Sequence, residues 1–136
     1  MVERTLVFLK PDAIERGLVG KILFRFEERG FKLLALQQLV ISVELSDKHY
    51  QEHVSKPFYP SLREYITGGP VVAFVLEGEA GVAIVRRMVG VTDAAEAASG
   101  TIRGDFALSK QFNIIHASDS IESARREIAN FFPELG

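Results

Sequence analysis

Six consecutive apolar residues, Val71-Val72-Ala73-Phe74-Val75-Leu76, predict a buried strand near the middle of this chain. Three further apolar segments, residues 5–9, 31–42 and 112–115, predict three more strands. The first of these is closed by Lys10-Pro11-Asp12, because proline cannot donate to a ladder and begins a turn. We therefore expect four strands, with the ammonium group of Lys10 held at the end of one of them.

Segments between and after these strands have the apolar spacing of amphipathic helices. Gly30 is the expected C-cap of the first helix, and Ser46 is a candidate N-cap of the second. The predicted helices cover residues 18–29, 46–54, 61–67, 80–89 and a last segment that opens at Asp119 or Ser120.

This alternation of strand and helix is compatible with a parallel flavodoxin-like sheet and with an antiparallel ferredoxin-like sheet. Because the strands are few and the sheet must bury one face on helices, we expect a two-layer α+β sandwich. No internal repeat or linker interrupts the sequence, so residues 1–136 are expected to form one domain.

The composition excludes several classes of protein. With 47% hydrophobic and 25% charged residues, the chain can form a core. A net charge of -2 is not that of a sequence-independent nucleic-acid binder, and the lack of cysteine excludes disulfides, thiol catalysis and thiolate metal sites. The N-terminal apolar run ends at Lys10, and no apolar stretch reaches the ~18 residues of a membrane span. We therefore expect a cytoplasmic protein with no membrane partner and no specific nucleic-acid partner.

His116 is the first candidate for a reacting group. It lies in Asn113-Ile114-Ile115-His116-Ala117-Ser118-Asp119, between an apolar pair and a segment that can start a helix, so we expect it at a strand end facing a cleft. A neutral imidazole can attack an electrophile near pH 7 without a base that deprotonates it first. The alternative is a surface or hydrogen-bonded structural histidine, which is the commoner role of a histidine after a strand.

Any phosphate-binding site must be built from side chains, because the chain has no glycine-rich phosphate loop. Gly20-Lys21 lacks the spacing and the hydroxyl of a P-loop, and no Gly-x-Gly-x-x-Gly occurs. Guanidinium forks and hydroxyls at element ends can neutralise a polyphosphate, although a solvated face is the commoner role of a single arginine. The candidates are Lys10, Arg86, Arg87, Thr92, Thr101, Arg103 and Asn113.

The segment His49-Tyr50-Gln51-Glu52-His53 fits the His-x-x-Glu-His pattern of inverted zinc peptidases. Two histidines four residues apart share one helix face and could bind a metal ion, with Glu52 as the base. The simpler interpretation is an exposed amphipathic helix with Tyr50 turned inward.

Phe58 lies between two prolines and is followed by Leu62 one turn later. Such a rigid apolar pair can clamp a flat ring, and it can equally form a cluster that covers the core.

Taken together, eight segments in order along nearly the whole chain form a specific set of motifs. They include Lys10-Pro11-Asp12, Gly100-Thr101-Ile102-Arg103-Gly104-Asp105-Phe106 and Asn113-Ile114-Ile115-His116, within residues 4–12, 16–20, 49–50, 56–58, 61–62, 69–72, 100–106 and 113–120. This set resembles the nucleoside diphosphate kinases.

The resemblance implies a ferredoxin-like sandwich with a four-stranded antiparallel sheet. It also implies ping-pong transfer of the γ-phosphoryl group from a nucleoside triphosphate, mainly ATP, to a nucleoside diphosphate through a phosphohistidine on His116. Mg²⁺ would arrive on the nucleotide phosphates without direct protein ligands, and the protein would be a homo-oligomer, either a tetramer or a hexamer. By the same resemblance Tyr50, Ser118 and Glu127 support His116, Lys10, Arg86, Thr92, Arg103 and Asn113 contact phosphates and ribose, and Phe58 and Leu62 hold the base.

The sequence departs from the family at three places. Ala13 and Ala117 stand where the family usually has glycine, and residues 93–99 lack the prolines common at positions 94 and 99. A catalytically silent nucleotide-binding module is the main alternative function, and the presence of His116 with all the phosphate residues argues against it.

Overall fold

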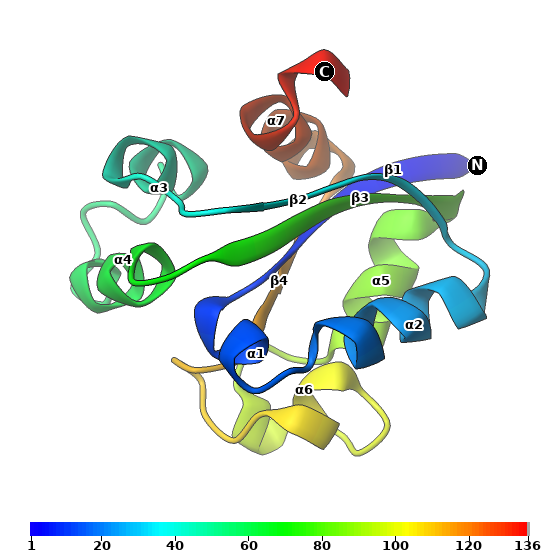
Figure 1. Ribbon diagram of the computed structural model, residues 1–136, viewed down its shortest axis with the longest axis horizontal. Coiled ribbons are helices and arrows are strands. Elements are labelled where there is room, and N and C mark those ends of the chain that lie inside the picture. Colours follow the sequence, from blue (N-terminus) through cyan, green and yellow to red (C-terminus); the bar gives the residue numbers. More distant parts are fainter. Residues whose placement is uncertain (136) are drawn as a thin grey trace.

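The computed structural model describes residues 1–135 and is organised around one four-stranded sheet in the order β2-β3-β1-β4 (Figure 1). Each pair of neighbours in this sheet is antiparallel. The strands are β1 (Val2–Leu9), β2 (Lys32–Leu39), β3 (Val71–Glu79) and β4 (Ile115–Ala117). The predicted ferredoxin-like α+β fold with a four-stranded antiparallel sheet is confirmed.

Helices cover both faces of the sheet, and Figure 1 shows α7 on one side with α2 and α5 on the other. Successive side chains of a strand point to opposite faces. Val7 in β1 therefore packs with Phe26 of α2, whereas Phe8 packs with Ile128 of α7. The helices are α1 (Pro11–Glu15), α2 (Val19–Arg29), α3 (Val43–His49), α4 (Tyr59–Thr67), α5 (Gly81–Val89), α6 (Ile102–Phe106) and α7 (Ile121–Phe131), with short 3-10 turns η1 (Ala94–Glu96) and η2 (Pro133–Leu135). Burial on two faces explains why Val71 to Leu76 are all apolar. Helices thus lie on both faces of the sheet, where the sequence predicted that one face would be buried on helices.

Three of the expected helix ends are found. Gly30 terminates α2 in the left-handed conformation with φ 110°, and α5 ends before Gly90. At α7, the Ser120 side chain accepts a hydrogen bond from the backbone N–H of Ser123. Within residues 1–135, no helix has the length and apolar character needed to cross a membrane.

The second predicted helix, residues 46–54, is wrong in both of its ends. The helix α3 begins after Ser42, whose Oγ accepts the Leu45 N–H at 3.0 Å, and it stops at His49. Ser46 instead lies inside the helix, where its buried hydroxyl meets the Tyr59 hydroxyl at 2.7 Å. Two serines four residues apart offered similar caps, and the tertiary contact of Ser46 decided between them.

The fourth strand was also predicted three residues too early. Ile114 has a φ of 61°, which is rare for a β-branched residue, and the N–H of Ile115 bonds back to the carbonyl of Asn113 at 2.8 Å. This tight turn prevents residues 112–114 from joining the ladder, so pairing with β1 starts only at Ile115. His116 therefore lies within the short β4, opposite Phe8 of β1.

Candidate active site

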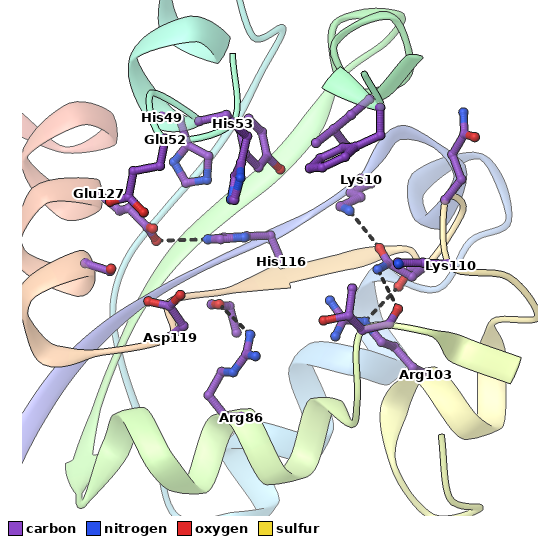
Figure 2. A pocket seen from close by; sticks show the side chains of 18 of the residues that line it. Lys10, His49, Glu52, His53, Arg86, Arg103, Lys110, His116, Asp119 and Glu127 are labelled. Atoms are coloured by element: carbon purple, nitrogen blue, oxygen red, sulfur yellow. Dashed lines mark hydrogen bonds and ion pairs between the residues drawn. The ribbon is translucent and has the colours of Figure 1, made fainter. Parts of the chain in front are cut away.

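A cavity of about 740 Å³ opens where β1 ends and β4 begins, between α4, α5, α6 and α7 (Figure 2). Ten of the eleven site residues that the family resemblance implies line it, namely Lys10, Tyr50, Phe58, Leu62, Arg86, Thr92, Arg103, Asn113, His116 and Glu127. The eleventh, Ser118, is fully buried and contacts Glu127. Residues that are up to 117 positions apart in the chain thus converge on one site.

One nitrogen of His116 is held by a carboxylate. Its Nε2 lies 2.9 Å from Glu127 Oε1, and the same oxygen accepts the Ser118 hydroxyl at 2.7 Å. Burial alone would raise the pKa of Glu127, but the charge and the hydrogen bond of His116 hold that pKa below its usual value. Because an ionised carboxylate only accepts, Nε2 carries the hydrogen and the lone pair of the ring remains on Nδ1.

Aromatic rings fix the orientation of His116. The Phe8 ring stacks on the imidazole with centroids 4.8 Å apart, and His49 contacts it edge-on at 4.5 Å. Tyr50 lies slightly farther away, at 6.3 Å. The imidazole is thus held on two sides, while its side chain keeps 18% exposure toward the cavity.

A hydrogen-bonded chain links Lys10, Asn113 and Thr92. The Lys10 ammonium donates to Asn113 Oδ1 at 2.7 Å, and Asn113 Nδ2 donates to the Thr92 carbonyl at 3.0 Å. Burial, helped by the nearby charge of Arg103, lowers the pKa of Lys10 to about 7. A cation that is costly to bury without a counter-ion is well suited to receive an anionic ligand.

Arg103 is buried and braces the backbone around the cavity. Its three nitrogens donate to the carbonyls of Ile115 at 2.6 Å, Gly90 at 3.0 Å and Asn113 at 3.4 Å. Burial, and to a smaller extent the charge of Arg86, lowers the pKa of Arg103 to about 10. The guanidinium has five N–H groups, so the bracing leaves donors for a ligand.

The other cationic wall is Arg86 on α5, which donates to the Ala117 carbonyl at 3.1 Å.

Two of the sequence candidates do not reach the cavity. Arg87 is absent from the residues that line it, and the Thr101 hydroxyl instead caps α6 by accepting the Gly104 N–H at 3.0 Å. Neighbouring arginines on a helix point in different directions, and a threonine before a helix is often its cap.

The rim of the cavity carries Phe58 and Leu62. Phe58 is 52% exposed and precedes α4, and Leu62 lies in the first turns of that helix. The exposed Phe58 ring is placed to contact a flat ring in the cavity, while Leu62 also packs against the core, so both interpretations of the pair hold in part.

The zinc-peptidase interpretation of residues 49–53 is not supported by the helix geometry. Because α3 ends at His49, His53 is not on the same helix face, and its Nδ1 instead faces the Lys56 ammonium at 2.9 Å.

Sequence reasoning missed several residues of this cavity. Asp119 lines it from just before α7 and Arg126 from the middle of that helix, and Lys110 and Gln111 line it from the loop before β4. Burial and the short distance to His116 make His49 part of the site as well. Only His49 had been noticed, as half of a metal motif, and its real neighbours come from distant parts of the chain.

Comparisons with known proteins agree with this fold and identify its family. Residues 3–135 match the family model described as nucleoside diphosphate kinase. A nucleoside diphosphate kinase from Nocardioides sp. is 57% identical over 132 residues, which cover 97% of this chain and 98% of that relative.

Two solved structures give the same result. The nucleoside diphosphate kinase of Aquifex aeolicus superposes with a TM-score of 0.95 at 45% identity, covering 99% of this chain and 98% of that one. The enzyme from Halobacterium salinarum, solved in complex with CDP, superposes with a TM-score of 0.94 at 46% identity, covering 97% of this chain and 88% of that one.

The fold and these similarities define a phosphoryl-transferring enzyme. The chain belongs to the nucleoside diphosphate kinase family. Its activity is the transfer of the γ-phosphoryl group of a nucleoside triphosphate to a nucleoside diphosphate, by the family's ping-pong mechanism through a phosphohistidine.

Proposed function

We propose that His116 carries the phosphoryl group and that Nδ1 is the attacking atom. One observation supports this assignment above all: Nε2 is held 2.9 Å from Glu127, which leaves the Nδ1 lone pair available at the cavity. In the first half-reaction Nδ1 forms a bond to the γ-phosphorus, the bond from that phosphorus to the bridging oxygen breaks, and the nucleoside diphosphate leaves with the electron pair. In the second, an oxygen of the acceptor's terminal phosphate displaces Nδ1 from phosphorus.

Glu127 and Ser118 support His116 in this scheme. The imidazole gains positive charge as the bond from Nδ1 to phosphorus forms, and the Glu127 carboxylate stabilises that charge through Nε2–H. Ser118 keeps the carboxylate in place. Tyr50 completes the wall beside the ring, and burial raises the pKa of its hydroxyl, so it stays neutral.

Lys10, Arg86 and Arg103, with Thr92 and Asn113, are proposed to bind the phosphates and the ribose. Phosphoryl transfer needs positioning and charge neutralisation more than covalent help from the protein, and three cations in one cavity supply both. The hydrogen bonds that already hold Lys10, Arg103 and Asn113 place these donors before the nucleotide binds.

Mg²⁺ is proposed to bind mainly through the nucleotide. The phosphate end of the cavity presents cations and amides, which suit phosphate oxygens, whereas Mg²⁺ requires oxygen ligands. When bound, Mg²⁺ adds positive charge to the transferred group and fixes the phosphate conformation.

The base is proposed to stack on Phe58 and Leu62. ATP is the expected main donor, with other nucleoside di- and triphosphates as further substrates, because faces and methyl groups do not read base edges. The Halobacterium salinarum relative was solved in complex with CDP, which supports nucleotide binding by this chain as well.

A homo-oligomer, tetramer or hexamer, and a cytoplasmic location are proposed with the family assignment. The exposed apolar residues Phe24, Leu36 and Val40, of which Leu36 lies on the edge strand β2, support association with further copies. Sedimentation velocity would give the number of chains.

The assignment is tested by incubating the protein with Mg²⁺ and γ-labelled ATP without an acceptor. We expect stoichiometric label on the protein that is lost in acid and retained in alkali, and release of that label to any added nucleoside diphosphate. His116→Ala should carry no label, whereas His53→Ala should label normally. Full labelling of His116→Ala would overturn the proposal.

A further inference from the structure

Three possible metal ligands from different elements meet at the base of the cavity. His49 at the end of α3, His116 in β4 and Glu127 in α7 each present a ligand atom, and these three atoms lie within 4.8 Å of one another (Figure 2). Phosphoryl transfer as proposed above uses His116 and Glu127 but gives His49 no chemical task.

His49 is a buried polar residue that lacks a partner. It is 4% exposed, and its Nδ1 has no hydrogen bond to any part of the chain that the structure describes. Leaving a buried nitrogen unpaired costs free energy, so such groups often indicate a ligand or a function. A neutral imidazole keeps a lone pair on one ring nitrogen, which can bind a metal ion.

We propose that His49, His116 and Glu127 form an inhibitory site for a divalent transition-metal ion of the zinc type. Two imidazoles and one carboxylate are a donor set that zinc favours, with a fourth position open to water from the cavity. Mg²⁺ prefers oxygen ligands and is a poor competitor for this site, which is therefore separate from the nucleotide-borne cation.

The inhibitory effect follows from the tautomer of His116, and this part of the inference rests on the proposed function. In the free enzyme Nε2 holds the hydrogen and Nδ1 holds the lone pair. A metal ion can bind Nε2 only when that nitrogen carries a lone pair, so the Nε2 proton must leave. Nδ1 then takes up one proton, and the ring stays neutral. His116 then has no lone pair with which to attack phosphorus.

The binding is expected to be reversible. Arg126 Nη2 lies 3.9 Å from the second Glu127 oxygen, and its positive charge opposes a cation at this place. We therefore expect added zinc to bind and to be removed by a chelator, rather than a resident ion that survives purification.

Zinc binding is tested first without nucleotide, by calorimetric titration of the full chain with zinc chloride. Wild type should bind one zinc ion per chain, and His49→Gln should raise the Kd at least tenfold. His53→Gln is the matched control, since His53 is a partly buried histidine that lines the cavity but is outside the cluster, and it should bind zinc as wild type does. Equal affinity in wild type and His49→Gln would overturn the site.

A second ligand removal guards against a folding defect in His49→Gln. Glu127→Gln should also raise the Kd at least tenfold, and thermal melts should confirm that both variants are folded. With cobalt as the probe, wild type should give the visible absorption of a four-coordinate ion and both variants should lose it; retained absorption in both would contradict the proposed ligands.

Inhibition is tested in a single turnover with excess Mg²⁺ over ATP. At a zinc concentration that saturates wild type, the rate of phosphoenzyme formation should fall more than tenfold in wild type and less than twofold in His49→Gln. A chelator should restore the rate of wild type. Unchanged labelling of zinc-saturated wild type would refute the tautomer mechanism. Should no phosphoenzyme form even without zinc, the proposed function of His116 fails, while the nucleotide-free titration still decides whether the metal site exists.

Discussion

The inner wall and the rim of the cavity are built in different ways. On the inner wall Lys10, Arg103 and Asn113 are all buried, and each is already hydrogen-bonded to the protein. On the rim Phe58 is half exposed and offers only an aromatic face. In the proposed binding mode the reacting phosphates would therefore meet groups with fixed positions, whereas the base would meet an exposed aromatic surface.

This contrast separates catalysis from recognition. Preorganised charges act strongly because they need no rearrangement in the transition state. An exposed aromatic surface contributes binding energy to any flat ring and distinguishes poorly between rings. Substitutions on the inner wall should therefore change the chemical step, and substitutions on the rim should change affinity.

The largest effect is expected from Arg103 on the inner wall. Arg103→Met removes a charge that faces the cavity and leaves the carbonyls of Gly90 and Ile115 without their donor. We expect kcat/KM to fall by about 10²- to 10³-fold, the range for loss of one preorganised donor, with a lower melting temperature. Arg87→Met, one residue beyond Arg86 on α5 and outside the cavity, is the control and should be close to wild type. If Arg103→Met lowered kcat/KM only slightly, the groups of the inner wall would not dominate the chemical step.

The next largest effect is expected on the rim. Phe58→Ala should weaken binding of ADP, GDP, CDP and UDP, each by about 1 to 3 kcal/mol, because a stacking surface is lost. The single-turnover rate at saturating nucleotide should change little. Selective loss of one base would show that an edge is read, and Lys110 and Gln111 would then be the first residues to examine.

A smaller effect should appear in the protons that accompany binding. With a pKa of about 7, Lys10 is mostly neutral at pH 8 in the free enzyme. Nucleotide phosphates raise the pKa of a nearby amine, so binding should take up part of one proton. Calorimetry of ADP binding at pH 8 in two buffers of different ionisation enthalpy measures this uptake. Lys10→Met should abolish it; identical uptake in that variant would assign the proton to another group.

The smallest effect is expected in the proline-free loop, none of whose residues 93–99 lines the cavity. Ala94 is the first residue of η1 after an extended Asp93, a position that accepts proline. Ala94→Pro should raise the free energy of unfolding by about 0.4 to 1 kcal/mol and leave labelling intact, and Ser99→Pro should do so where its φ is near -65°. Ala95→Pro is the matched control, since it removes the N–H that bonds to Asp93 Oδ1 at 3.1 Å, and it should destabilise. A lower melting temperature for Ala94→Pro would show that the family's loop geometry does not hold here.

Local sequence patterns predicted the elements whose positions depend on neighbouring residues in the chain. The apolar run at residues 71–76 and the helical spacing with Gly30 gave β3 and the end of α2. The positive φ of Ile114 and the burial of Ser46 depend on contacts with distant residues, so the start of β4 and the cap of α3 were misplaced.

The residues of the candidate site also fall into two groups, those that a local sequence pattern marks and those that it does not. Lys10 and His116 could be recognised because each follows a buried apolar run. Glu127 has no local pattern that marks it, and its role came only from the family resemblance. The contact of His49 with His116 joins segments 67 residues apart, which no single-sequence pattern brings together.

The ring nitrogen of His116 that carries the phosphoryl group distinguishes the proposed mechanism from its alternatives. The phosphoenzyme would be isolated in alkali after reaction with Mg²⁺ and ATP, and its phosphorus NMR shift compared with the two phosphohistidine isomers. Because Glu127 holds Nε2, we expect the phosphoryl group on Nδ1 of His116. Phosphorylation on Nε2, or on another residue, would contradict the mechanism proposed for this site.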